Sequence, residues 1–326
     1  MAWSVSWSVS INGTDRTGSM SSYLTDISVT DKAGATSDSC SLTFDDTEGQ
    51  LLLPKNDEDI LVRLNGVQVF SGIISSVRSK GSRSGGRLLM VQGKGVDTRG
   101  KAKQAQCFHM DDCSLDDFMQ KAASKAGFSI EVKGDLASIQ RGYWANDRQS
   151  FLHLGERLAR ELGATFKVRG KKAVLAPRGD DMGLPAIAGV VGLNLISWDI
   201  EPDLGRSRFS AGSMQYYDRS TGKIETEEAS YQSGSSSTEA KDVGRVLASS
   251  KDEAKQKLEG RKQEASRKGG KGSAVINIAP SAQAEGLFTL SGARSGVDGS
   301  YKMTSVTHKA SRSGGATTSL QLEQPE

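Results

Sequence analysis

Apolar and small polar residues alternate along much of the first third of the chain. Between positions 3 and 11 every second residue is large and apolar, and serine fills the positions between them. A period of two places the large side chains on one face of a β-strand. The alternation returns at 24–29 and 60–64, and the Asn-Gly pair at 65–66 marks a hairpin turn. The pattern predicts antiparallel β-structure from residue 1 to about 96.

The pattern becomes helical beyond about residue 100. Apolar residues recur at helical spacing over 115–122 and again over 151–162, where they form one face of each helix. Ser114 is a favourable N-cap for the first helix, and Gly127 is a favourable end for it. Short strand patterns follow both helices, so we predict a small α+β domain at 101–182.

Strand patterns resume in the last part of the chain and continue to its end, with one interruption. Strands are expected at 193–200, 209–217 and 223–231, and a highly charged helix follows at about 250–267. We assign residues 183–326 to a second β domain that carries this helix as an insertion.

One hairpin sequence occurs twice, once in each β region. Residues 76–86 and 305–315 agree at eight of eleven positions, including the Ser-Arg-Ser-Gly-Gly that ends both copies. Each copy lies between alternating flanks, so each is predicted to be a strand, a basic glycine-containing turn and a return strand. We infer that a whole β domain has been duplicated.

The charge and cysteine content narrow the class of protein. The 42 basic and 39 acidic side chains nearly cancel, so the net charge of +3 gives no strong overall attraction to nucleic acid or membrane. Cys40, Cys107 and Cys113 follow no disulfide spacing, which favours a reducing compartment with free thiols. The first residues lack a signal-peptide pattern, and we expect a soluble protein that is synthesised in the cytoplasm.

Candidate chemistry is sparse. The three histidines have no G-x-S-x-G pattern beside them, and Cys107, His109 and Cys113 lack the fourth ligand of a structural zinc site. Adjacent acids such as Asp45 and Asp46 point to opposite faces of a strand, so they do not form a catalytic pair. We therefore expect no enzymatic activity, no cofactor and no metal.

The C-terminal region resembles the ending of the late control protein D family of contractile-tailed phages. The resemblance rests on 299–308, which has a Gly-x-Tyr start and then Val and His, and on the Thr-rich return strand at 317–323. Three further regions agree in order along the chain, namely 70–73, 151–163 with Phe166, and the charged helix.

Proteins of this family are baseplate hub proteins of phage tails and of related devices such as R-type tailocins. The resemblance implies two tube-like antiparallel β-barrel domains per chain, here 1–100 and 183–326. It also implies a homotrimer whose six barrels present a pseudo-sixfold ring to the tail tube and bind a central spike. His308 is then a packing or hydrogen-bonding residue, and Tyr301 a core or interface aromatic.

The resemblance also implies a set of partners and a location. The implied partners are the central spike protein and the tail tube or tube-initiator protein, with tape measure and baseplate wedge proteins as further candidates. The location is the baseplate of a virion or tailocin particle. No specific binding to nucleic acid or membrane is expected.

The repeated hairpins supply the candidate contact residues. Lys80, Arg83, Lys309 and Arg312 lie at the two basic turns, where we expect interface or lumen contacts. The alternative is that they are solvated turn residues, which turns select for other reasons.

A second function stays open at this point. The middle domain at 101–182 could make the chain a cell-wall-binding or lytic tail component. That hypothesis predicts a saccharide-binding surface centred on Tyr143 and Trp144.

Overall fold

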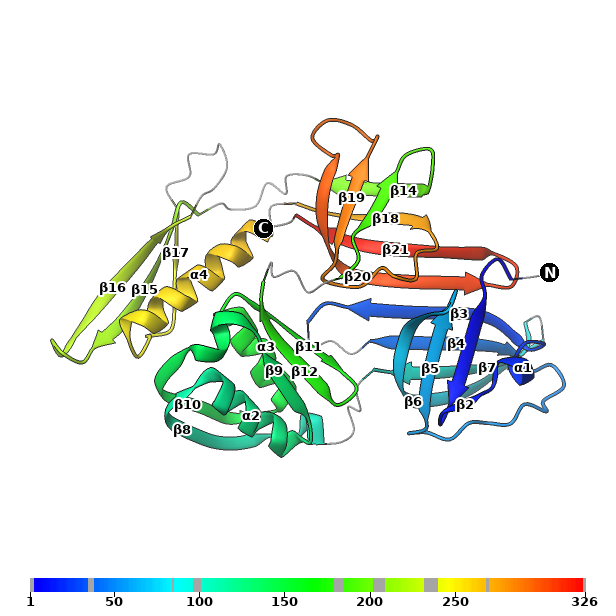
Figure 1. Ribbon diagram of the computed structural model, residues 1–326, viewed down its shortest axis with the longest axis horizontal. Helices are drawn as coiled ribbons and strands as arrows, with labels where there is room; N and C mark the ends of the chain where they lie inside the picture. Colours follow the sequence, from blue (N-terminus) through cyan, green and yellow to red (C-terminus); the bar gives the residue numbers. More distant parts are fainter. Residues whose placement is uncertain are drawn as a thin grey trace.

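The computed structural model describes residues 3–34, 38–83, 85–95, 101–178, 184–201, 209–231, 240–267 and 270–324. Most strands belong to one 13-stranded sheet, and three smaller sheets complete the structure (Figure 1). The chain is therefore mainly β with small α+β parts, as the sequence predicts. No helix within the described residues is long and apolar enough to span a membrane.

The first barrel unit comprises residues 3–95. Its strands are β1 (Trp7–Ile11), β2 (Thr14–Asp15), β3 (Leu24–Lys32), β4 (Ser39–Asp45), β5 (Asp59–Leu64), β6 (Val67–Ser82) and β7 (Gly86–Lys94), with the short helix α1 (Thr17–Met20). They pair in the order β3-β4-β7-β6-β5-β1-β2. On β4, Cys40, Leu42 and Phe44 are buried while the residues between them are not, which is the predicted period of two.

The second barrel unit comprises residues 184–201 and 270–324. Its strands are β13 (Ile187–Val190), β14 (Leu195–Glu201), β18 (Lys271–Asn277), β19 (Leu287–Ser291), β20 (Gly299–Ser311) and β21 (Gly315–Glu323). They pair in the order β14-β18-β21-β20-β19-β13 around a separate apolar core. One pairing corrects the expectation of a fully antiparallel barrel, because β13 runs parallel to β19 whereas β1 runs antiparallel to β5.

The two units match residue by residue across the repeated hairpin. Ser82 pairs with Gly86 at one tip, and Ser311 pairs with Gly315 at the other. Each hairpin also has a β-bulge at the same position. The Ser75 hydroxyl donates to the Gln92 carbonyl at 3.1 Å, and the equivalent Thr304 hydroxyl donates to the Gln321 carbonyl at 3.3 Å. The hairpins are therefore equivalent in space as well as in sequence.

The equivalence extends beyond the hairpin to five strands. β3 pairs with β4 as β14 pairs with β18, and both pairs have a register shift at the same place. Ile27 lies opposite Leu42 in one unit, and Trp198 lies opposite Ala274 in the other. Strands β5 and β19 then occupy the same place beside β6 and β20. The duplication inferred from eleven residues is thus a duplication of five strands in one register.

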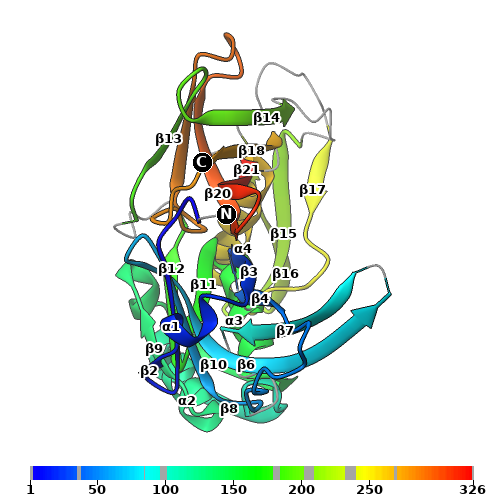
Figure 2. The same cartoon turned by 90° about the vertical axis from the view of Figure 1, so that its right-hand side faces the viewer.

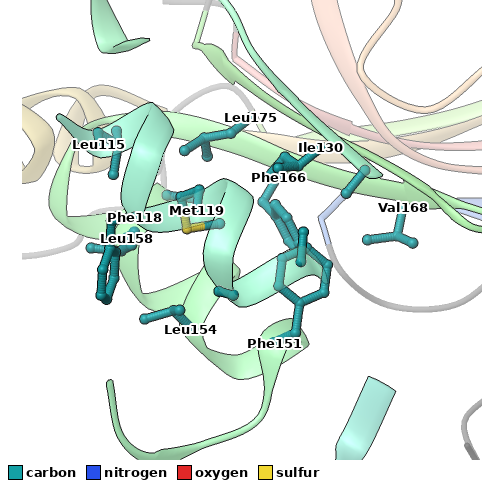
Figure 3. Packing of buried hydrophobic residues seen from close by; sticks show 14 of the residues in the cluster. Leu115, Phe118, Met119, Ile130, Phe151, Leu154, Leu158, Phe166, Val168 and Leu175 are labelled. Atoms are coloured by element: carbon teal, nitrogen blue, oxygen red, sulfur yellow. The ribbon is translucent and has the colours of Figure 1, made fainter. Parts of the chain in front are cut away.

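The middle domain packs two helices on two small sheets. Its elements are η1 (Lys101–Lys103), β8 (Gln106–Ser114), α2 (Leu115–Ala126), β9 (Ser129–Val132), η2 (Gly134–Ser138), β10 (Gln140–Gln149), α3 (Phe151–Glu161), β11 (Ala164–Arg169) and β12 (Lys172–Pro177). Ser114 accepts a hydrogen bond from the Asp117 amide at 3.1 Å, and Gly127 ends α2 in the left-handed conformation. Figure 3 shows Phe118, Phe151 and Phe166 packed between these elements.

An arm separates two strands of the second barrel unit. It consists of β15 (Ala211–Asp218), β16 (Lys223–Ser230), β17 (Lys241–Val243) and α4 (Lys251–Arg267), and α4 covers one face of the sheet (Figure 1). The strands expected at 209–217 and 223–231 exist, but they form this sheet rather than part of the second barrel. Alternation identifies a strand without saying which sheet contains it.

The insertion is therefore larger than the predicted helix. Residues 202–270 stand between β14 and β18, where the first unit has only residues 33–38 between β3 and β4. The divisions at 100/101 and 182/183 fall in or beside segments outside the described residues, and they stay interpretations.

Candidate assembly interface

The two barrel units are joined edge to edge by β20 and β3. These strands pair antiparallel, from Ser305 opposite Lys32 to Ser311 opposite Asp26. Figure 1 shows β21, β20, β3 and β4 as successive strands of one sheet. The same sheet runs without a break from β14 at one end, through β6, to β2 at the other.

Side chains on both faces of the sheet support this junction. The Thr30 and Thr307 hydroxyl oxygens are 3.1 Å apart, which is a hydrogen bond between the strands. On the other face, Ile27 lies opposite Ala310, and both are almost fully buried in the core of the first unit. The junction therefore combines a hydrogen-bonded outer face with an apolar inner face.

Arg312 extends the junction past the end of the paired strands. Its guanidinium donates to the carbonyl oxygens of Ser22 and Ser21 at 3.0 and 3.2 Å, and its amide donates to the Thr25 carbonyl at 2.9 Å. All three acceptors belong to the first unit, whereas Arg312 belongs to the second. Arg312 is thus a contact between barrel units, within one chain.

The other three candidate residues are exposed. Lys309 lies on β20 opposite Ser28 of β3, at the internal junction. Lys80 and Arg83 lie on and just beyond β6, at the tip of the first hairpin. The four residues therefore belong to two separate hairpins, and among the described residues only the second hairpin faces another barrel unit of the same chain.

A mostly buried ion cluster fixes the middle domain beside the junction, and the sequence analysis did not predict it. Lys167 of β11 contacts Asp31 at 2.6 Å and Asp38 at 2.9 Å. Asp31 also accepts a hydrogen bond from the Ala284 amide of the second unit at 3.0 Å. Burial raises the pKa of Asp38, and the positive charge of Lys167 opposes that rise. One carboxylate, that of Asp31, therefore links three parts of the chain.

A signal for this cluster was present in the alternation of β3. Leu24, Ile27 and Val29 are its buried apolar residues, and Asp31 continues the same face. A carboxylate at an apolar-face position implies a buried partner. The identity of that partner depends on a long-range contact that no local pattern reveals.

His308 has the packing role implied by the family resemblance. Its ring is buried, with Nδ1 3.0 Å from the Thr318 hydroxyl and Nε2 3.3 Å from the Ala282 carbonyl. Burial lowers the pKa of His308, although the Ala282 carbonyl and Asp31 partly oppose that effect. Tyr301 is likewise almost fully buried in the second core.

Only one of the two aromatic residues expected to bind saccharide on the middle domain is exposed. Trp144 is only 2% exposed, and its indole N–H donates to the Cys113 carbonyl at 3.0 Å. Tyr143 is exposed and stacks on His109, with ring centroids 5.7 Å apart. Neighbouring residues on a strand face opposite ways, so the pair could not line one surface.

The other candidate chemistry lies on β8. Cys107, His109 and Cys113 are spaced along this strand, and Cys107 is exposed. Among the described residues, no group of three or more His, Cys, Asp or Glu side chains lies close enough to hold a metal ion.

Comparison with known proteins gives matches at the level of structure. No protein-family model and no curated protein matches the sequence. The 43 kDa tail protein of prophage MuSo2 from Shewanella oneidensis matches with a TM-score of 0.76 at 13% identity, over 99% of each chain. A tail protein from Neisseria meningitidis MC58 matches with a TM-score of 0.71 at 16% identity, over 99% of this chain and 97% of that one.

A third match comes from a secretion system. The c3393 protein of Escherichia coli is a type VI secretion component that is structurally similar to the T4 phage tail proteins gp27 and gp5. It matches with a TM-score of 0.60 at 10% identity, over 98% of this chain and 76% of that one. These similarities confirm the fold expected from the family resemblance.

Proposed function

We propose that this chain, which has the fold of prophage tail proteins, is a structural baseplate hub of a contractile phage tail or tailocin. Three copies form a ring of six barrel units that joins the tail tube to the central spike. The protein acts by geometry and carries out no catalysis. Its place is the baseplate of the virion or tailocin particle.

The observation that carries this proposal is the β20–β3 junction between two equivalent units. One chain already holds two copies of the same five strands side by side in one sheet. A head-to-tail contact of this kind closes into a ring when its rotation permits closure. Three chains of two units each give six barrels, which matches a sixfold tube to a threefold spike.

The partners follow from the two symmetries of such a ring. The face that presents six similar barrels suits the tail tube or its initiator protein. Features that only one of the two units has, such as the arm of β15–β17 and α4, would occur three times in the ring. They suit a threefold spike on the opposite face. Tape measure and baseplate wedge proteins are further partners in this proposal.

The experiment that tests the hub is a mass measurement in solution. The purified protein is examined by native mass spectrometry, alone and mixed with its spike. A species containing three chains is expected in at least one of the two samples. A strict monomer in both samples would contradict the hub.

A further inference from the structure

We infer that the outer edge of β6 pairs with β14 of a second copy of this chain, in the register that β20 and β3 use inside one chain. This inference rests on the proposed hub and specifies the strands and residues that join its subunits. It follows from the equivalence of the two units. β6 is the counterpart of β20, and β14 is the counterpart of β3.

Both edges are open within the described residues. Residues 76–82 of β6 pair with β7 on one side only, whereas the equivalent part of β20 pairs with β21 and with β3. From Ser197 to Glu201, β14 pairs with β18 on one side only, whereas β3 pairs with β4 and β20. Figure 2 shows β14 near the top of the molecule and the β6–β7 hairpin projecting from its lower right side. An unpaired strand edge is a template for a further strand.

Transfer of the internal register predicts the residues that face each other. Arg78 is equivalent to Thr307, and Glu201 is equivalent to Thr30. The pair Thr307–Thr30 inside one chain therefore corresponds to Arg78 opposite Glu201 of the next chain. Lys309 opposite Ser28 becomes Lys80 opposite Asp199.

The transferred pairs have complementary charges. Arg78, Lys80, Asp199 and Glu201 are all exposed, and within the described part of the chain none of them forms an ion pair. β6 therefore offers two positive charges where β14 offers two negative ones. Opposite charges across a strand pair stabilise it, and like charges destabilise it.

The sizes of the inner-face residues are complementary as well. Ile27 opposite Ala310 at the internal junction becomes Trp198 opposite Gly81 at the new one. Ile27 is 1% exposed, but Trp198 is 41% exposed, and no strand of the described residues covers it. A glycine opposite the indole leaves room for the larger ring. Leu193, just before β14, is 77% exposed, and Ile196, on β14, is 55% exposed.

Arg83 has a defined role in this junction. It is the counterpart of Arg312, which binds the Ser21 and Ser22 carbonyls in the turn before β3. The corresponding turn before β14 contains Gly192 and Leu193. The guanidinium of Arg83 therefore binds these two carbonyl oxygens of the neighbouring chain.

Disulfide cross-linking tests the register directly. Lys80→Cys and Asp199→Cys are placed in one chain whose Cys107 and Cys113 are replaced by serine. Directly opposed residues on paired strands are close enough for a disulfide, so oxidation is expected to give covalent multimers. Ser28→Cys with Lys309→Cys is the matched control. It joins the equivalent internal pair and is expected to cross-link within one chain only.

Charge reversal tests the same contact without cysteine. Arg78→Glu with Lys80→Glu, or Asp199→Lys with Glu201→Lys, is expected to weaken the trimer at least tenfold. The two reversals combined are expected to restore it. Arg219→Glu with Lys223→Glu makes the same change of charge on the exposed β15–β16 turn and is expected to have no effect.

The outcomes separate this junction from the hub itself. A trimer that cross-links through residues 80 and 199 supports both. A trimer that does not cross-link there, and is insensitive to both reversals, overturns the β6–β14 junction and leaves the hub. A monomer that does not cross-link at these positions overturns the junction, and the mass measurement with the spike then decides the hub separately.

Discussion

The two barrel units share one strand register but differ in what lies at their edges. Ile27 and Trp198 occupy the same position in the two units, yet Ile27 is 1% exposed and Trp198 is 41% exposed. The difference arises because β20 covers the edge of the first unit, whereas no described strand covers the edge of the second. Burial of an equivalent residue is therefore set by the neighbouring unit. The comparison shows that the core of a barrel unit is fully covered only where a strand of another unit pairs with its edge.

The largest expected effect concerns the ion cluster that ties the first unit to the middle domain. Lys167→Met removes the ammonium shared by Asp31 and Asp38 and is expected to lower the free energy of unfolding by about 3–5 kcal/mol. Guanidinium unfolding measures the change. Lys172→Met on the next strand is the control, because Lys172 is exposed. A loss below about 1 kcal/mol, in the range of an exposed pair, would show that the cluster does not hold the units together.

The next effect tests whether equivalent core positions are energetically equivalent. Ile74 and Met303 occupy the same place in the two hairpins, and both are fully buried. Ile74→Ala and Met303→Ala are each expected to cost about 2–5 kcal/mol through lost burial and the cavity left behind. Chemical unfolding followed by hydrogen exchange locates each loss. If one variant were as stable as the wild type, the two cores would not be comparable.

A pH effect is expected from a difference between the hairpins. His308 takes the position that Ser79 has in the first unit, and burial lowers its pKa below the ordinary 6.5. The unfolded chain therefore takes up this proton before the folded chain does. Stability should fall as the pH drops below about 6.5, by at most about 1.4 kcal/mol per pH unit.

The His308→Gln variant isolates this contribution. The free energy of unfolding of the variant and of the wild type is measured at several pH values between about 5 and 8. The variant is expected to lose less stability on acidification. Parallel pH profiles for the two proteins would contradict the assignment of the effect to His308.

The smallest effect concerns the matched bulges. Ser75→Ala and Thr304→Val each remove one hydroxyl that donates to a backbone carbonyl in a partly exposed setting. Each is expected to cost about 0.5–1.5 kcal/mol, and the two costs should agree within a factor of about two. Thermal unfolding measures both. Costs that differ severalfold would show that the bulges have different roles in the two units.

The sequence predicted local features well, because local periodicity carries them. Alternation located the barrel strands, Ser114 and Gly127 marked the ends of α2, and the repeated hairpin revealed the duplication. Alternation could not show which sheet a strand joins, because the strands of the arm alternate like barrel strands but pack against α4. The Lys167–Asp31 contact and the burial of Trp144 depend on long-range packing, which no short window of sequence contains.

Electron cryo-microscopy of the purified assembly with its spike would show whether three chains form a ring of six equivalent barrels. We expect a closed threefold ring in which β20–β3 junctions within chains alternate with β6–β14 junctions between chains. A map in which β6 and β14 face solvent, or in which the two barrel units of a chain contribute to different layers, would contradict it.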